Sequence, residues 1–215
     1  MSKIASMQMK FSDALQEFEA AWVNPDFTRF ELPPVRVNQV LDEKYIMEPS
    51  IRISRKMVWD MELKKAWDPL RFIPYVVSEG KSWGRHEIGQ SYERFSRASV
   101  QAGWITSQRG QVLEDVFLDH LNQRILFLGR NQMQGEGGSL IASGYQPLFH
   151  VEHGVGGTEE EPLNLWRIVV LTKGMDERFT EPFKQMVARG MLPGFLEIYI
   201  EQELKAKLNA IPVSN

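Results

Sequence analysis

The four histidines are the side chains best suited to proton transfer, and two of them lie close together. His150 and His153 lie on either side of Glu152. On a strand, residues two apart point to the same side, so we expect His150 and Glu152 to share a face and His153 to lie at the strand end. Imidazole exchanges a proton near neutral pH, which predicts His150 as an acid or base at a cavity mouth. His86 and His120 fall at a predicted strand start and in a predicted turn, where surface or structural roles are expected.

The same segment gives a weaker indication of a metal site. His150 and Glu152 would supply two ligands, and Glu197 or Glu201 would have to complete the set. A catalytic zinc ion needs three protein ligands and an open position. The sequence supplies barely enough donors, so we expect no metal and no other cofactor. The chain has no cysteine, which excludes disulfides and thiolate catalysis.

Carboxylates alternate within one predicted strand. Glu114 should face opposite to Asp115 and Asp119, so at least one carboxylate faces inward. A buried carboxylate has a raised pKa and acts as an acid or base; the alternative is an edge strand whose charges prevent further pairing. Tyr92 offers a hydrogen bond to a bound carbonyl or phenol, or is a satisfied core residue. We take His150, Glu114 and Tyr92 as the catalytic candidates.

Residues 176–208 form the longest predicted helix. Their apolar and small residues recur in steps of three and four, the helical period. The members of this stripe are Phe183, Met186, Val187, Gly190, Met191, Gly194, Phe195, Ile198 and Tyr199. Glycine weakens a helix and proline removes a backbone donor, so Gly190, Pro193 and Gly194 predict a kink or break. The small residues serve either close helix–sheet packing or a cavity wall, and the sequence leaves both open.

The rest of the chain alternates between helical and strand patterns. Helices are predicted at Phe11–Val23 and 57–67, with a short one at 35–41 within an otherwise irregular segment, 27–50. Strands are predicted at 51–55, 89–99, 111–119, 124–130, 140–151 and 163–171. Turns are expected at 78–84 and 120–123, and loops at 134–138 and 154–162. Connections of hairpin length favour antiparallel pairing, because parallel strands need long crossovers. We therefore expect an α+β fold in which a curved antiparallel sheet wraps around the long C-terminal helix.

Composition narrows the class of protein. The chain has 215 residues, 43% of them hydrophobic and 25% charged, which fits one globular domain with an extension. A net charge of -3 argues against a nucleic-acid surface. We find no apolar run long enough for a membrane span and no secretory signal in residues 1–10, so we expect a cytoplasmic protein.

Several local features occur in a characteristic order. A predicted helical segment that contains Trp59 ends at an Asp-Pro pair, 68–69; a glycine-bounded turn follows at 84–89, and an Asp–turn–Arg pattern at 119–124. Closed by the C-terminal helix, this succession resembles the START-like, helix-grip superfamily, also called SRPBCC, over residues 51–208. The resemblance implies a deep cavity between the sheet and the final helix. Members of the superfamily bind lipids, steroids, polyketides or hormones there, and some act as cyclases or hydrolases.

The N-terminal segment has no counterpart in the minimal pattern of that superfamily. We divide the chain into residues 1–50, a helical and extended segment that packs on the domain, and a helix-grip domain, 51–215. The segment would either cap the cavity or mediate a homodimer. Residues 32–34 and 40–42 are faintly similar to the lead-in of a related branch, the metal-dependent phloroglucinol hydrolases, which cleave a carbon–carbon bond. That branch carries a metal-binding histidine on its final helix, whereas no histidine follows residue 153 here.

Three hypotheses for the function follow, besides a metal-dependent hydrolase. The first is a cavity protein that performs cyclisation, hydrolysis or another acid/base step on an aromatic or polyketide-like molecule. The second is a carrier of a small apolar ligand without chemistry, and the third an interaction module that uses the N-terminal segment. An enzyme should bring polar groups together at one point of the pocket, whereas a carrier should have an apolar lining. The expected apolar wall consists of Trp59, Trp67, Trp104, Phe117, Trp166, Met191, Phe195 and Tyr199.

Overall fold

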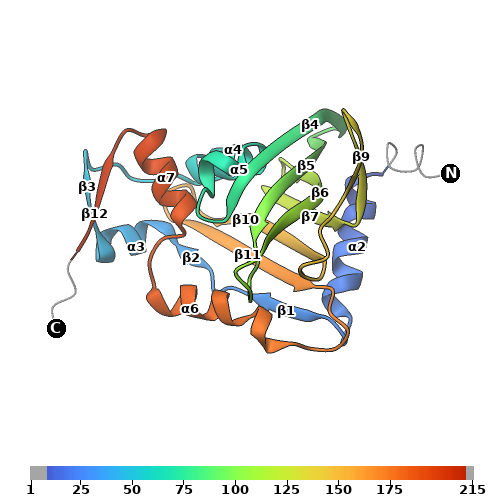
Figure 1. Cartoon of the computed structure of the whole chain (residues 1–215). Coiled ribbons are helices and arrows are strands. Elements are labelled where there is room, and N and C mark those ends of the chain that lie inside the picture. The colour runs from blue at the N-terminus through green and yellow to red at the C-terminus, as the bar shows by residue number, and fades with distance from the viewer. Residues whose placement is uncertain (1–8, 212–215) are drawn as a thin grey trace.

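One large antiparallel sheet organises the molecule (Figure 1). The structure, a computed structural model, describes residues 9–211. The strands follow the order β1-β11-β10-β7-β6-β5-β4, and β2 also pairs with β11. Their bounds are Thr28–Glu31 (β1), Val35–Arg36 (β2), Val77–Gly89 (β4), Tyr92–Ala102 (β5), Arg109–Asp119 (β6), Arg124–Arg130 (β7), Phe149–Gly157 (β10) and Pro162–Val170 (β11). With helices against both faces of this sheet, the predicted α+β class is confirmed.

The β6–β7 hairpin forms where the alternating pattern predicted it. Asp119 pairs with Arg124 at the end of the ladder. The carboxylate of Asp119 accepts hydrogen bonds from the backbone and side-chain N–H groups of Asn122. Gln123 closes the turn in the left-handed region, with a φ of 51°. Turn chemistry of this local kind fixes a hairpin without help from distant residues, which is why the sequence revealed it.

Residues 27–50, which showed no sustained period, contribute three strands and a helix. Strands β1 and β2 pair with β11 at one edge of the large sheet. Helix α3 (Val37–Lys44) follows, close to the short helix predicted there. A small second sheet pairs β3 (Tyr45–Glu48) with β12 (Lys207–Ala210), close to the end of the described chain. Through β1 and β2, part of residues 27–50 is therefore paired into the edge of the large sheet.

Three helices cover one face of the sheet, here called the inner face. They are α4 (Arg55–Trp67), α5 (Pro69–Phe72) and α7 (Gly194–Gln202). Helix α4 begins after Ser54, whose hydroxyl accepts a hydrogen bond from the backbone N–H of Met57. Because the helix starts within 51–55, the strand predicted there is wrong. The main hydrophobic core joins α4 and α7 to inner-face side chains such as Phe95 and Phe127.

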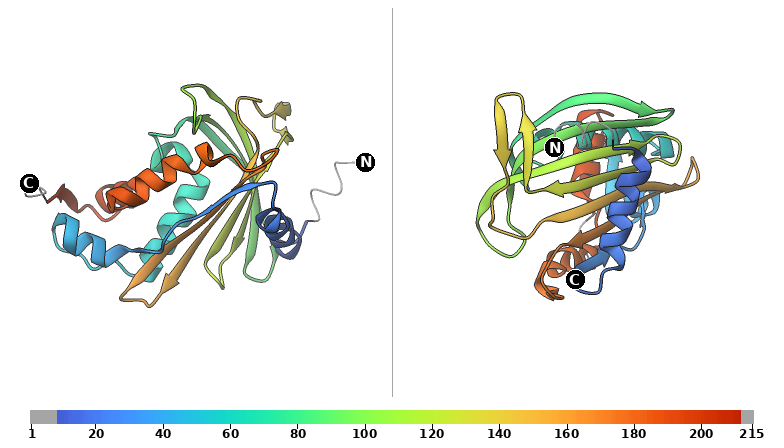
Figure 2. Two further views of the ribbon diagram at one scale, coloured as in Figure 1. Left: turned by 90° about the horizontal axis from the view of Figure 1, so that it is seen from below. Right: turned by 90° about the vertical axis from the view of Figure 1, so that its right-hand side faces the viewer.

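Helix α2 (Phe11–Val23) covers the opposite, outer face (Figure 2). Its buried residues recur in steps of three and four: Phe11, Ala14, Phe18 and Ala21. They pack on outer-face side chains of three strands, namely Phe117, Leu126, Leu128 and Val169. The predicted bounds of this helix are confirmed, because a single apolar stripe decides both its length and its buried side.

The C-terminal segment contains a short 3-10 helix, Glu177–Phe179, and two α-helices rather than one. Helix α6 (Glu181–Arg189) ends at Gly190, which adopts a left-handed backbone with a φ of 61°. Helix α7 starts four residues later, so the predicted break is confirmed. The expected continuation of the helix to residue 208 is wrong. A positive φ of 57° at Lys205 turns the chain into β12 instead.

Three predicted turns or loops form strands. Residues 78–84 belong to β4 and residues 154–157 to β10, and 134–138 lies in a small hairpin of β8 (Gln132–Gly135) and β9 (Gly138–Ile141). Glycines in these segments indicated breaks, but pairing with neighbouring strands holds the backbone extended. Within residues 9–211, no helix has the length and apolar character to cross a bilayer. The expected lack of a secretory signal concerns residues 1–10, most of which lie outside the described residues.

Candidate functional site

A cavity of about 560 Å³ lies between the inner face of the sheet and helices α6 and α7. Its wall is largely aromatic and apolar, with Trp104, Phe127, Phe149, Trp166, Met191 and Phe195 among the lining residues. Helix α6 contributes Phe183 and Met186 to this wall, yet none of its own residues is fully buried. A cavity of this size and lining suits a small hydrophobic or aromatic molecule.

Two charged residues of α4 are buried beside this cavity. Glu62 and Lys65 are separated by one helical turn, and 0% and 3% of their surfaces are exposed. Lys65 Nζ lies 2.6 Å from Glu62 Oε2 and 3.8 Å from the ring centre of Phe195. The ammonium group therefore contacts a carboxylate on one side and an aromatic face on another. Such burial is tolerated because each charge has a partner.

His153 of β10 completes what we call the lysine cluster, Glu62, Lys65 and His153. Its Nδ1 lies 2.7 Å from Lys65 Nζ and 3.3 Å from Glu62 Oε1. Glu62 Oε1 also accepts a hydrogen bond from the side-chain amide of Asn164, at 2.7 Å. Asn164 in turn accepts from the indole N–H of Trp166. A chain of hydrogen bonds thus connects the aromatic wall to the Lys65 amine.

A second ion pair faces the cavity from the sheet. Arg97 of β5 and Glu114 of β6 are cross-strand partners, with Nη2 and Oε2 2.7 Å apart. Arg97 also donates a hydrogen bond to the backbone carbonyl of Ala66, and its guanidinium lies 4.6 Å from the ring centre of Phe127. Arg97 and Glu114 therefore join Lys65 and His153 as polar groups of an otherwise largely apolar wall.

Burial sets the protonation states of the lysine cluster. It lowers the pKa of Lys65 to about 8, although the Glu62 carboxylate acts against it. Burial and then the charge of Lys65 lower the pKa of His153 to about 4. Burial pushes the pKa of Glu62 upward, but Lys65 and His153 outweigh it and bring that pKa down to about 2. Near neutral pH, Lys65 is therefore the member of the cluster closest to a change of charge.

Five of the residues selected from the sequence line the cavity. They are Trp104, Glu114, Trp166, Met191 and Phe195. Four of them are large apolar side chains on three separate elements or their flanking loops, and the fifth is the carboxylate that pairs with Arg97.

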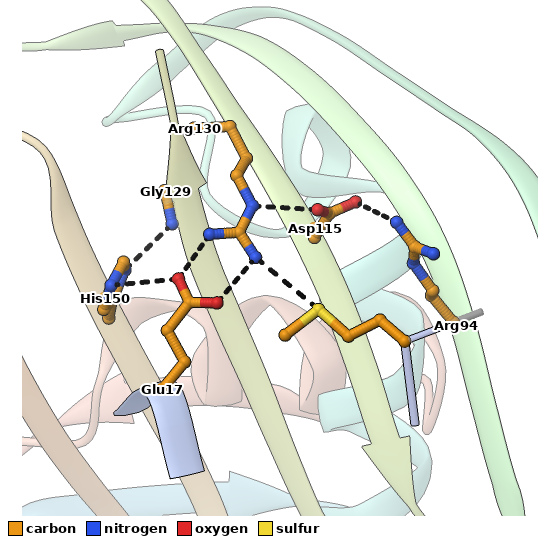
Figure 3. Close-up of polar contacts among 7 residues, drawn as sticks. Glu17, Arg94, Asp115, Gly129, Arg130 and His150 are labelled. Carbon is orange, nitrogen blue, oxygen red and sulfur yellow. Dashed lines mark hydrogen bonds and ion pairs between the residues drawn. The ribbon is translucent and has the colours of Figure 1, made fainter. Parts of the chain in front are cut away.

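His150 and Tyr92 lie on the outer face, away from the cavity. Figure 3 shows His150 beside Gly129 and Glu17; its Nδ1 accepts a hydrogen bond from the Gly129 N–H at 3.1 Å, and Nε2 lies 3.6 Å from the Glu17 carboxylate. Burial lowers the pKa of His150. Tyr92 stacks on an aromatic ring of α2. The expected convergence of these two residues with Glu114 therefore does not form, because they lie on opposite faces of the sheet.

The outer-face polar groups hold α2 in place. Arg130 pairs with Glu17 of α2 and, at 2.9 Å, with Asp115, which also binds Arg94 (Figure 3). A similar ion pair joins Glu19 of α2 to a strand arginine. Through Arg130, the charged strand residue Asp115 therefore helps to hold α2 against the sheet.

The remaining candidates do not line the cavity. Phe117 lies in the outer-face cluster under α2. Trp59 meets the edge of His120, and Trp67 packs against a core phenylalanine with 37% of its surface exposed. Tyr199 donates a hydrogen bond to Asp60 at 2.8 Å. Their aromatic character alone did not indicate which side of each element faces the cavity.

Glu62, Lys65 and Arg97 were not among the residues predicted from the sequence, and His153 had only a secondary place there. A signal was available in the predicted helix 57–67. Glu and Lys one turn apart on the apolar stripe of a helix are unusual, because such residues are almost never fully buried unless paired. Arg97 carried no comparable signal, since any strand arginine fits an exposed face.

The metal ligands considered from the sequence do not converge. Glu152 lies on the outer face and pairs with Arg124 and Arg167, whereas Glu197 lines the inner cavity and accepts a hydrogen bond from Tyr45. Across the described residues, no group of three or more His, Asp or Glu side chains is placed to hold a metal ion.

Comparisons with known proteins reveal similarity of structure only. No family model matches the chain, and no curated protein matches it. The Zhui aromatase/cyclase from Streptomyces sp. R1128 is 12% identical, with a TM-score of 0.46 over 83% of this chain and 95% of that one. A major latex-like protein from Panax ginseng is 11% identical, with a TM-score of 0.41 over 75% of this chain and 94% of that one. A norcoclaurine synthase point mutant from Thalictrum is 10% identical, with a TM-score of 0.44 over 84% of this chain and 99% of that one.

These similarities are distant, and the fold is established by the topology of the chain itself. An antiparallel sheet closes over C-terminal helices with a cavity between them. This is the START-like, helix-grip layout, so the resemblance stated from the sequence is confirmed at the level of fold.

Proposed function

We propose that the protein binds a small aromatic or polyketide-like molecule in the cavity and performs an acid/base step on it, of the kind that cyclises or hydrolyses such compounds. The observation that carries this proposal is the lysine cluster set into an apolar wall. Each Å² of apolar ligand surface removed from water contributes about 25 cal/mol to binding. The polar groups then meet the carbonyl or phenol oxygens of the bound molecule.

The cluster supplies a proton donor and a neighbouring acceptor. Lys65, with a pKa lowered to about 8 by burial, is mostly protonated at neutral pH and releases its proton readily. His153 is uncharged there and lies within hydrogen-bond reach of the amine. Arg97, held by Glu114, offers guanidinium N–H groups that orient a second oxygen of the ligand. A polar wall of this kind favours chemistry over a purely apolar carrier site.

Hydrogen–deuterium exchange next to a carbonyl tests the acid/base role without knowledge of the natural substrate. An aryl 1,3-diketone is incubated with the protein in deuterium oxide, and exchange at the carbon between the carbonyls is followed by NMR. The two histidines of β10 provide matched variants, because His153 faces the cavity and His150 faces α2. We expect His153→Gln to slow the catalysed exchange by about 10²-fold, the usual contribution of a positioned acid or base, and His150→Gln to leave it unchanged in the folded protein.

The carrier hypothesis makes a different prediction for the same probe. Binding is measured by quenching of tryptophan fluorescence, with Trp104→Ala at the cavity wall and Trp67→Ala outside it as a pair. Weaker binding in Trp104→Ala alone supports the cavity as the ligand site. Tight binding without any catalysed exchange contradicts the acid/base step and leaves a carrier. Equal binding in both variants contradicts the cavity assignment itself.

A further inference from the structure

We propose that Lys65 forms an imine with aldehydes or ketones held in the cavity, so that carbonyl compounds with an aromatic or apolar body are its preferred ligand class. This inference rests on the proposed function, because it needs a molecule bound in the same cavity. It goes further by naming the reacting atom, the ligand class and a covalent intermediate.

The position of Lys65 is what a carbonyl-binding amine requires. Among the described residues that line the cavity, Lys65 is the only lysine. Its Nζ lies 3.8 Å from the ring centre of Phe195 and 5.7 Å from that of Trp166. Those two rings stack on each other with a centroid separation of 5.3 Å, and both line the apolar surface of the cavity beside the amine. An aromatic ligand packed on this surface places a carbonyl substituent next to Nζ.

The surroundings of the amine favour its neutral, nucleophilic form. Glu62 faces it from α4, Arg97 from β5 and His153 from β10, while Phe195 of α7 and Trp166 of β11 place rings beside it. Burial lowers the pKa of Lys65 to about 8, with Arg97 adding to the effect and Glu62 opposing it. About a tenth of the molecules therefore carry a neutral amine at pH 7, against well under a thousandth for an ordinary lysine of pKa about 10.4.

The reaction is balanced with the groups present. The Nζ lone pair bonds to the carbonyl carbon, the carbonyl π electrons move to oxygen, and the first of the two amine protons passes from Nζ to that oxygen to give a carbinolamine. His153 Nδ1, 2.7 Å from Nζ, accepts the proton that nitrogen releases and returns it to the departing hydroxyl. Loss of one water molecule leaves the carbon–nitrogen double bond. No oxidant, reductant or further reactant is consumed, and water reverses the reaction.

Reductive trapping tests the inference on the full chain. The protein is incubated with 2-naphthaldehyde and cyanoborohydride, which converts an imine to a stable secondary amine, and the modified lysine is located by peptide mapping. Lys64 is the internal control, since it precedes Lys65 on α4 but pairs with Asp60 and Glu203, with 38% of its side chain exposed. We expect at least about tenfold more label on Lys65 than on Lys64, following the lower pKa. Label distributed over exposed lysines, with Lys65 unmodified, overturns the inference.

Variants and a matched probe separate this inference from the proposed function. Lys65→Arg keeps the charge but cannot form an imine, and should abolish the label, whereas Lys64→Arg should keep it. If Lys65→Arg fails to fold, the double variant Glu62→Gln, Lys65→Met replaces it, because it removes both buried charges together and should also abolish the label. The peptide mapping of the unaltered protein does not depend on either variant. 2-Naphthalenemethanol, which lacks the carbonyl, reports binding alone. If it binds while the aldehyde leaves Lys65 unlabelled, the imine is refuted and the proposed function stands; if neither probe binds, both are refuted.

Discussion

Replacing His153 by glutamine removes a titrating ring from the cavity wall and keeps a side chain that can accept a hydrogen bond from Lys65. Burial and the charge of Lys65 lower the pKa of His153 from 6.5 to about 4. The unfolded chain therefore takes up a proton at this position before the folded protein does as the pH falls. At about 1.36 kcal/mol per pH unit, the folded state loses about 3 kcal/mol of stability from this group between pH 6.5 and pH 4.

Urea unfolding followed by tryptophan fluorescence measures this loss. Between about pH 7 and pH 4.5, the unaltered protein should lose about 2 kcal/mol more stability than His153→Gln does. His86→Gln is the matched control, because His86 is exposed and its ring hydrogen-bonds to the backbone carbonyl of Gly84. His86→Gln should lose as much stability between about pH 7 and pH 4.5 as the unaltered protein does. An identical acid-induced loss in the unaltered protein and in His153→Gln would show that His153 is not held neutral by its surroundings, and would refute the reasoning.

Three substitutions outside the lysine cluster test the scaffold. Gly129→Ala should destabilise the fold by about 1–3 kcal/mol in urea unfolding, because an added Cβ would lie 2.5 Å from the backbone carbonyl oxygen of Phe149; an unchanged midpoint would contradict that close approach. Phe18→Ala should cost about 3–5 kcal/mol, since this ring lies fully buried between α2, to which it belongs, and the sheet. The folded fraction should still bind 2-naphthalenemethanol; lost binding would mean that α2 shapes the cavity. Gly190→Ala should cost about 1 kcal/mol from its left-handed backbone, and no loss would indicate a different end to α6.

The sequence revealed those parts of the fold that depend on local patterns. The apolar stripe of α2, the β6–β7 hairpin with its Asp119 turn and the break at Gly190 each follow from residues within a few positions of one another. Strands β1 and β2 were missed because they pair with β11, more than a hundred residues away. Short segments of this kind acquire strand structure only from a distant partner.

The candidate site was harder to predict because it depends on which face of each element points inward. Alternation along β10 separated His150 from His153, but nothing local showed which of the two faces the cavity. Helix α4 presented the same difficulty, since Glu62 and Lys65 belong to its buried side although their charges suggested solvent. Only the packing of α4 against β10 and β11 brings the lysine cluster together.

Helix α6 closes the cavity without a single fully buried residue and ends at a left-handed glycine. Opening such a helix locally breaks few apolar contacts, so it should require much less free energy than unfolding the sheet. In the proposed function, ligand exchange then depends on residues 181–190. The stability of the fold depends on other residues, those of the strands, α2 and α4. Under the proposed function, changes in α6 should therefore alter the rate of ligand release while the strands and α4, which hold Lys65, stay intact.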